Sequence, residues 1–180
     1  MMLTGIDHHR IGAGINKAGL MRLPELQSRP GYEGYLNESA ITFATLLKDS
    51  GYHTFMSGKW DPGRIPGRLA ADRGFERSFI LAMGGASHFS DAVGTFRAAE
   101  EAHYFEGSDE VRDLPEDFYS SKSYTDRMIT YIDEIEDDKP FMAYLSFTAA
   151  HWPLQVPDEW LDRYRGQYDA GWQTIRKARF

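Results

Sequence analysis

One pattern occurs twice in this chain and restricts its fold more than any other feature. In residues 37–48, apolar side chains repeat at helical spacing, and a short apolar run bounded by glycines follows at residues 52–57. Residues 123–137 are again amphipathic, and the run at residues 141–147 is apolar except for Ser146. A helix followed by a buried strand, twice over, predicts an α/β fold with a largely parallel sheet flanked by helices.

The details of these elements can also be predicted. Asn37 or Ser39 is suited to cap the first helix, because a short polar side chain can accept a hydrogen bond from a free backbone N–H group. Residues 141–147 should be buried on both faces, as strands of parallel sheets usually are. A second strand is expected at residues 79–83 and a last helix at residues 157–164, where Pro-Asp-Glu favours a helix start.

The segments between these elements are rich in turn residues. Residues 5–36 contain many glycines and prolines and are predicted to form a long loop, and residues 86–116 to form turns with short strands in a solvated insertion. Residues 1–5 resemble the last turn of a helix stopped by glycine, and residues 171–180 resemble a helix that has only begun. These ends indicate a part of a larger domain.

Composition narrows the class of protein. The 180 residues suffice for one domain with a core, and the net charge of −7 argues against a general nucleic-acid binder. There is no cysteine, which excludes disulfides, thiolate metal sites and a cysteine nucleophile within this chain. No apolar run is long enough for a membrane span, and no signal peptide is recognisable.

Polar residues follow both strands of the repeated pattern. Lys59 and Asp61 come after the first strand, and His151 lies four residues beyond the second. Parallel sheets bind ligands beyond the carboxyl ends of their strands, so Lys59 and His151 are expected to face one cavity. A lysine suits a tetrahedral anion and a histidine can protonate a leaving oxygen, which together fit a sulfate or phosphate ester. The alternative is a solvent-facing lysine and a packed loop histidine.

Other clusters of charged residues are weaker candidates. Asp7, His8 and His9 could suggest a metal site, but capping roles in a polar loop are favoured because no second group of ligands lies near them in the sequence. The acidic residues 133–138 are predicted to be a solvated helix face. Four arginines between residues 64 and 77 could line an anion site or be loop residues in water, and both interpretations stay open: Arg64, Arg68, Arg73 and Arg77.

Several stretches resemble the sulfatase family, and the resemblance covers nearly the whole chain. Residues 51–60, Gly-Tyr-His-Thr-Phe-Met-Ser-Gly-Lys-Trp, are similar to the family's second signature, Gly-Tyr-x-Thr-x-x-x-Gly-Lys-Trp-His. Four further stretches resemble bacterial arylsulfatases. They are Leu-Thr-Gly with Asp-His-His in residues 3–9, residues 72–76 with 84–89, His-Trp-Pro-Leu-Gln at residues 151–155, and residues 164–172.

This resemblance implies an alkaline-phosphatase-like fold and hydrolysis of sulfate esters, either small molecules or glycans. It implies that Lys59 contacts the sulfate and that His151 binds the ester and assists the leaving group. It also implies a formylglycine nucleophile and a divalent cation, expected to be Ca²⁺. The motifs that would supply both are absent, so residues 1–180 resemble a catalytic domain truncated at both ends and are expected to be inactive alone. Sulfatases of this kind are often exported, which is compatible with a periplasmic or secreted location.

One departure from the family pattern lies inside the best-matched signature. The histidine that follows Lys-Trp in the family is Asp61 here. A carboxylate repels a sulfate and cannot donate a hydrogen bond unless protonated. This leaves two alternatives to sulfate-ester hydrolysis: a phosphate or phosphonate ester hydrolase on the same fold, and a non-catalytic module whose site has decayed.

Overall fold

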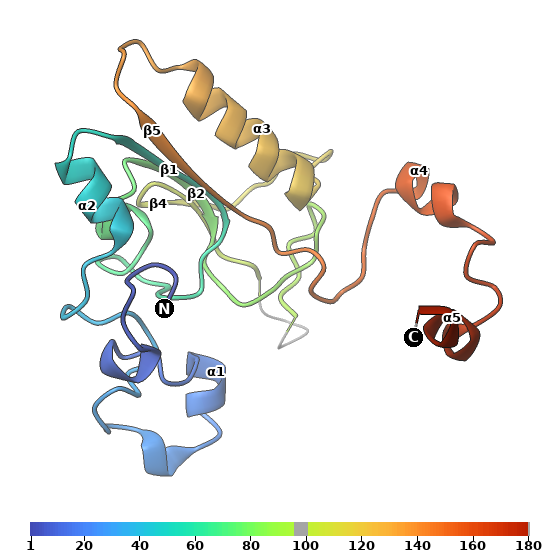
Figure 1. The fold of residues 1–180 in the computed structure, drawn as a ribbon, viewed down its shortest axis with the longest axis horizontal. Helices are drawn as coiled ribbons and strands as arrows, with labels where there is room; N and C mark the ends of the chain where they lie inside the picture. The colour runs from blue at the N-terminus through green and yellow to red at the C-terminus, as the bar shows by residue number, and fades with distance from the viewer. Residues whose placement is uncertain (96–100, 180) are drawn as a thin grey trace.

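A five-stranded mixed sheet forms the centre of the computed structural model, which describes residues 1–95 and 101–179 (Figure 1). The strand order is β4-β3-β2-β1-β5. β1 pairs in parallel with β2 on one side and β5 on the other, whereas β3 and β4 are antiparallel. The strands are β1 (His53–Lys59), β2 (Arg77–Leu81), β3 (Tyr104–Glu106), β4 (Asp109–Val111) and β5 (Phe141–Ser146).

The two strands of the repeated pattern are β1 and β5, and they pair side by side, which the sequence pattern had left open. The added strands β3 and β4 fall within the segment predicted to contain turns and short strands. Residues 96–100 of that segment lie outside the described residues.

Side chains of successive strand residues enter two separate cores. Phe55 and Phe79 face the core that includes the long helix α3 (Ser120–Asp133), and Met56 and Ile80 face the core beside α2 (Phe43–Asp49). This alternation is the two-residue period of a pleated strand. Figure 1 shows the two helices on opposite faces of the sheet. The result is a three-layer α/β arrangement, as the sequence predicts.

The start of the first helix differs from the prediction. α2 begins at Phe43 and is capped by Thr42, whose Oγ1 accepts a hydrogen bond from Thr45 N at 3.1 Å. Thr42 Oγ1 also donates to Arg73 O at 2.6 Å, which ties the cap to the segment before β2. Asn37 instead accepts hydrogen bonds from Ser39, in a turn of its own. The Asn37 side chain thus accepts hydrogen bonds as predicted, but in a local turn rather than at the start of the helix.

The second strand of the repeated pattern also differs in burial. β5 lies at the edge of the sheet, and its residues are exposed or half-buried, with Phe141 46% exposed. Its mostly apolar sequence is nevertheless typical of a strand covered on both faces. α3 shields one face, because Tyr124, Met128 and Tyr131 pack against the sheet. The other edge of β5 has no strand beside it among the described residues.

The two ends of the chain extend from this body. Short helices interrupt the predicted N-terminal loop, and α4, η4 and α5 follow β5; Figure 1 shows α4 and α5 away from the sheet. None of the helices in the described residues combines the length and apolar character that crossing a membrane requires. The bounds are η1 (His8–Arg10), α1 (Lys17–Leu20), η2 (Pro24–Leu26), η3 (Ala71–Arg73), α4 (Asp158–Leu161), η4 (Asp162–Tyr164) and α5 (Trp172–Arg179).

Candidate active site at the carboxyl edge of the sheet

Lys59 is half-buried and is the last residue of β1, whereas the predicted strand ended at residue 57 and left Lys59 in the loop beyond it. The residue before it, Gly58, has a φ of +119° and lies opposite Ser146 of β5. A Cβ at Gly58 would come within 1.9 Å of Ser146 O. Only glycine tolerates this close approach and this backbone conformation. The glycine of the Gly-Lys-Trp signature therefore allows β1 and β5 to stay paired up to the lysine.

The segment after Lys59 is fixed by Trp60. Its side chain is buried, its backbone N–H donates to Leu81 O at 2.8 Å, and its indole Nε1 donates to Arg68 O at 3.0 Å. The indole bond closes the loop between residues 60 and 68. Asp61 thereby leaves the sheet in a defined direction, and its half-buried side chain lines a cavity.

His151 lies in the loop after β5, five residues beyond the end of that strand. Its backbone N–H donates to Thr148 O at 2.9 Å, and its ring Nδ1 lies 2.6 Å from Trp152 O. Because a carbonyl oxygen only accepts, Nδ1 carries a hydrogen, and Nε2 is the nitrogen at which the neutral ring can take up a proton. The ring packs against Gly85, where a Cβ would be 3.0 Å from Nδ1.

Three strands thus contribute to one edge of the sheet. Gly85 follows β2, His151 follows β5, and β1 with Lys59 at its end lies between those strands. Because the His151 ring contacts the segment after β2, its loop reaches across the carboxyl end of β1. The structure therefore brings the lysine and the histidine to the same edge. Their roles in catalysis stay a prediction.

His88 was not assigned a role from the sequence, yet it holds the His151 loop. It is buried, and its Nε2 donates to His151 O at 3.4 Å while Nδ1 lies 2.7 Å from Ser120 Oγ. Its backbone N–H donates to Gln155 Oε1 at 2.8 Å. The available signal was the Gly-Gly pair at residues 84–85, which follows β2 and lies three residues before His88.

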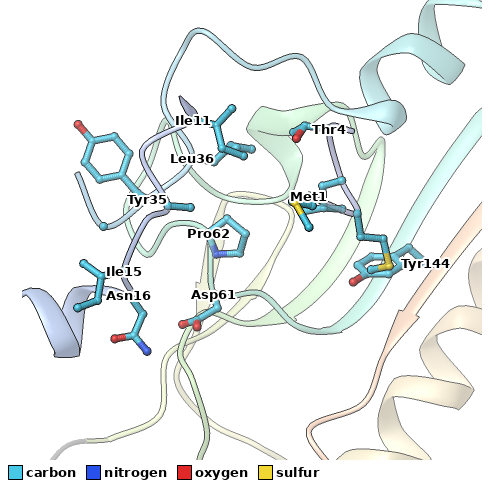
Figure 2. Close-up of a pocket in the computed structure, with 14 residues that line it drawn as sticks. Met1, Thr4, Ile11, Ile15, Asn16, Tyr35, Leu36, Asp61, Pro62 and Tyr144 are labelled. Carbon is cyan, nitrogen blue, oxygen red and sulfur yellow. The ribbon is translucent and has the colours of Figure 1, made fainter. Parts of the chain in front are cut away.

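A cavity of about 330 Å³ opens beside Asp61 (Figure 2). Its lining comes from the chain start, the N-terminal loop, the segment after Trp60, and Tyr144 of β5. Figure 2 shows the Asp61 carboxylate and the Asn16 amide at the same end of the cavity. Most of the remaining lining is apolar, with Met1, Leu3, Ile11, Ile15, Leu36 and Pro62 among it.

The four arginines after Asp61 divide into two pairs. Arg73 is buried, donates to Leu36 O at 2.7 Å and pairs with Glu38 at 3.0 Å. Arg77 pairs with Glu134 and lies over the ring of Tyr131. These two hold the fold together. Arg64 and Arg68 line a second, smaller cavity next to Asp61. Arg73, which is buried, and Arg77, which lies in β2, therefore fit neither interpretation of the basic stretch, whereas both stay open for Arg64 and Arg68.

The capping interpretation of Asp7 is confirmed. Asp7 Oδ1 accepts a hydrogen bond from His9 N at 2.9 Å and caps η1, and this bond is the main reason that the pKa of Asp7 is lowered. Asp7, His8 and His9 also place one ligand atom each within 4.8 Å of one another, but all three residues are exposed.

The cation that the sequence resemblance implies does not fit the described part of this chain. Among the described residues, the Asp7 group is the only set of three metal-ligating side chains that converge, and it lies on an exposed turn rather than beside Lys59. The carboxylate nearest Lys59 in sequence is the single Asp61. No step of the chemistry is therefore assigned to a metal held by these residues.

A mixed sheet flanked by helices, with Lys59 and the His151 loop at the carboxyl ends of its strands, is an α/β fold of the alkaline-phosphatase-like kind. The chain belongs to the sulfatase family, whose family model matches residues 1–179. It is 40% identical to an arylsulfatase of Klebsiella aerogenes over 99% of this chain and 38% of that protein. It is 38% identical to an uncharacterized sulfatase of Schizosaccharomyces pombe over 99% of this chain and 33% of that protein.

Solved structures agree on the fold. The structure of Ps i-CgsB in complex with k-i-k-neocarrahexaose matches with a TM-score of 0.72 at 23% identity, over 91% of this chain and 36% of that one. A protein solved in complex with its substrate D-glucosamine-2-N,6-O-disulfate matches with a TM-score of 0.60 at 21% identity, over 91% of this chain and 26% of that one. The chain thus spans well under half the length of these relatives.

Proposed function

We propose that residues 1–180 form part of the catalytic domain of a sulfatase that hydrolyses sulfate esters to an alcohol and sulfate. The observation that carries this proposal is the convergence of Lys59 and the His151 loop at the carboxyl edge of the sheet. Family membership supports sulfate-ester hydrolysis in general. The position of Lys59 and of the His151 loop at the ends of adjacent strands supports assigning these two side chains to the ester.

Each of the two residues has a distinct role in the proposed chemistry. The Lys59 ammonium binds the sulfate oxygens and stabilises the charge that they carry in the transition state. His151 supplies a proton from Nε2 to the ester oxygen as the S–O bond breaks, because Nδ1 is held by the Trp152 carbonyl. His88 positions this loop through the His151 carbonyl.

The proposed roles can be tested in the longer parent protein with 4-nitrophenyl sulfate as substrate. Lys59→Met and His151→Asn should each lower kcat/KM by about a hundredfold or more. Asp138→Asn, an exposed change of charge elsewhere, is the matched control. The phosphate-ester alternative is tested by the same assay with 4-nitrophenyl phosphate. Preferential turnover of the phosphate would contradict the proposal.

The chain alone is proposed to be inactive. The exposed edge of β5 supports this, because a mostly apolar strand of a parallel sheet is usually paired on both edges and covered on both faces. The share of the relatives' length that the chain covers supports it too. Turnover of 4-nitrophenyl sulfate by the purified 180-residue chain, abolished by Lys59→Met, would refute this part of the proposal.

Asp61 favours the non-catalytic alternative, since it replaces a hydrogen-bond donor with an acceptor. Asp61→His in the parent protein separates the alternatives. A gain of a hundredfold or more in aryl sulfate turnover would indicate a decayed site. A functional site that uses Asp61 predicts no such gain.

A further inference from the structure

Gln155 lies in the loop after β5, four residues beyond His151, and its side chain is half-buried. Its Oε1 atom accepts two hydrogen bonds, from His88 N at 2.8 Å and from Ser87 Oγ at 3.1 Å. A backbone N–H group only donates, so the side-chain atom beside His88 N is the amide oxygen and not the amide nitrogen. Ser87 and His88 are both buried and follow β2. The Gln155 side chain therefore joins the loop after β5 to a buried segment 67 positions earlier in the chain.

Together with His151, Gln155 closes a ring of contacts around His88. The backbone N–H of His88 donates to Gln155, and the ring Nε2 of His88 donates to His151 O at 3.4 Å. In the neutral ring Nδ1 then accepts, so Ser120 Oγ donates to it at 2.7 Å. Gln155 N also donates to Pro153 O at 3.0 Å, which keeps the segment between the two contacts folded. The position of His151 therefore depends on the Gln155 contact as well as on the His88 ring.

A second anchor holds the loop on the other side of His151. Thr148 O accepts the hydrogen bond from His151 N at 2.9 Å, and Thr148 Oγ1 lies 3.5 Å from the hydroxyl of Tyr124 on α3. Thr148 and Tyr124 are both buried. The loop is thus fixed to α3 before His151 and to the segment after β2 beyond it, through Gln155.

Anchors of this kind matter because residues 147–157 belong to no helix or strand, although the structure describes all of them. A general acid has to lie within about 2.6–3.2 Å of the leaving oxygen, and a shift of the order of 1 Å can reduce the rate about a hundredfold. In an irregular loop such precision does not come from the hydrogen bonds of a helix or a sheet. It has to come from the contacts on either side of His151.

From these contacts we infer that Gln155 is a positioning residue for the proton transfer, because its side-chain oxygen holds the His151 loop against Ser87 and His88. This inference rests on the proposed function, since it takes His151 as the general acid. As the S–O bond breaks, its electron pair stays on the ester oxygen and the proton from His151 Nε2 neutralises that oxygen. Gln155 acts through His151, so its loss should slow the reaction most where the leaving oxygen most needs the proton.

Two aryl sulfates that differ in their need for a proton test the inference in the parent protein. The 4-nitrophenolate of 4-nitrophenyl sulfate is a weak base and leaves readily, whereas the phenolate of phenyl sulfate is a stronger base and needs the proton more. Gln155→Met keeps the length of the side chain but removes the acceptor oxygen. It should lower kcat for phenyl sulfate about tenfold more than kcat for 4-nitrophenyl sulfate. Gln155→Glu retains an acceptor oxygen and should restore the wild-type ratio of the two rates.

Matched controls separate this inference from the proposed function. Gln27→Met, at an exposed glutamine whose amide donates to Leu20 O, should change neither rate. If Gln155→Met fails to fold, Ser87→Ala removes one of the two hydrogen bonds and should show the same preference in a weaker form. An equal loss with both substrates, or no loss, would overturn the inference where His151→Asn shows the larger loss with phenyl sulfate. Equal losses with both substrates in His151→Asn itself would count against the proposed function instead.

Discussion

Gly85 and His151 are in direct contact, although they follow different strands and are 66 positions apart in the sequence. A Cβ on Gly85 would be 3.0 Å from His151 Nδ1 and 3.1 Å from Thr95 Oγ1. These separations are shorter than ordinary van der Waals contacts, so a methyl group must displace the ring or the hydroxyl. The lack of a side chain at Gly85 therefore helps to position His151, the candidate general acid.

Gly85→Ala should consequently impair catalysis more than stability. A shift of the order of 1 Å in a catalytic group can reduce the rate by about a hundredfold, and a smaller shift of the ring should reduce kcat by about tenfold. The measurement is turnover of 4-nitrophenyl sulfate by the parent protein, beside its melting temperature. Gly51→Ala is the control: a Cβ there would meet nothing within 4 Å, and the change adds left-handed backbone strain, which Gly85 does not have, far from the His151 loop. An equal loss of kcat in both variants would contradict the explanation.

His88→Ala should destabilise the fold and loosen the His151 loop together. The substitution removes the ring that joins Ser120 Oγ to His151 O, and it leaves Ser120, itself buried, without that partner. The loss of a buried polar link of this kind is worth about 2 kcal/mol in the free energy of unfolding. Chemical denaturation measures the loss, and amide exchange at residues 148–155 measures the loosening. His103→Ala, at an exposed histidine, is the control.

The sequence predicts the order of elements here because each strand carries its own local signal. Gly58 and Trp60 belong to a signature that is recognisable in the sequence alone, and both proved to position Lys59. The repeated helix–strand pattern predicted β1 and β5 themselves but left their pairing open. In both cases the information lies within about fifteen consecutive residues.

The parts that could not be predicted depend on residues far apart in the chain. Thr42 caps α2 because its hydroxyl also reaches Arg73 O, 31 positions away, and no local pattern separates it from Asn37. The exposure of β5 depends on which strand lies beside it, which apolar composition does not reveal. The smaller cavity next to Asp61 needs Glu33 and Arg64 to meet across 31 positions.

Thr42→Ala tests the corrected helix start. The substitution removes both the hydrogen bond that Thr42 accepts from Thr45 N and the one that it donates to Arg73 O. Both are lost at a buried position, since Thr42 is 1% exposed. We expect a loss of about 1–2 kcal/mol in the free energy of unfolding, measured by urea denaturation. Ser39→Ala, which affects only an exposed local turn, should cost less than about 0.5 kcal/mol. A larger loss of stability in Ser39→Ala than in Thr42→Ala would instead indicate that the helix begins near residue 39.

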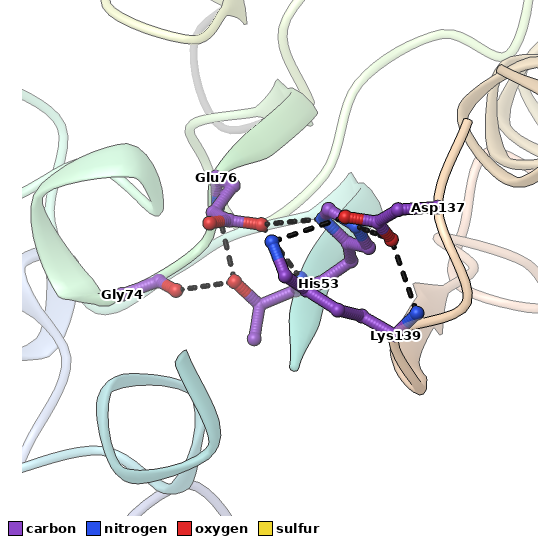
Figure 3. Close-up of polar contacts among 6 residues, drawn as sticks. His53, Gly74, Glu76, Asp137 and Lys139 are labelled. Carbon is purple, nitrogen blue, oxygen red and sulfur yellow. Dashed lines mark hydrogen bonds and ion pairs between the residues drawn. The ribbon is translucent and has the colours of Figure 1, made fainter. Parts of the chain in front are cut away.

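His53, at the amino end of β1, should give the fold a dependence on pH (Figure 3). Its Nε2 lies 2.9 Å from Asp137 Oδ1 and its Nδ1 3.2 Å from Glu76 Oε2. Carboxylates only accept, so both ring nitrogens donate and the ring is protonated. The bond to Asp137 raises the pKa of His53 above its usual 6.5, and Glu76 raises it further against the opposing effect of desolvation.

The direction of the effect follows from that raised pKa. A group that binds its proton more tightly in the folded state stabilises the fold fully below pH 6.5, and this contribution is lost as the pH rises through the folded pKa. Asp137 acts in the opposite direction. Its hydrogen bond with His53, followed by those from Lys139, lowers its pKa to about 2. Its contribution is therefore present above pH 3.8 and lost as the pH falls toward 2.

The free energy of unfolding should thus decrease between pH 6.5 and the folded pKa of His53, and His53→Asn should remove the part of that decrease due to this residue. Urea denaturation at a series of pH values measures it, and NMR titration of the ring gives the pKa directly. His103→Asn is the control, because His103 contacts only one carboxylate group, that of Glu110, among the described residues. A His53 ring that titrates at or below pH 6.5 would show that the two carboxylates do not hold it protonated.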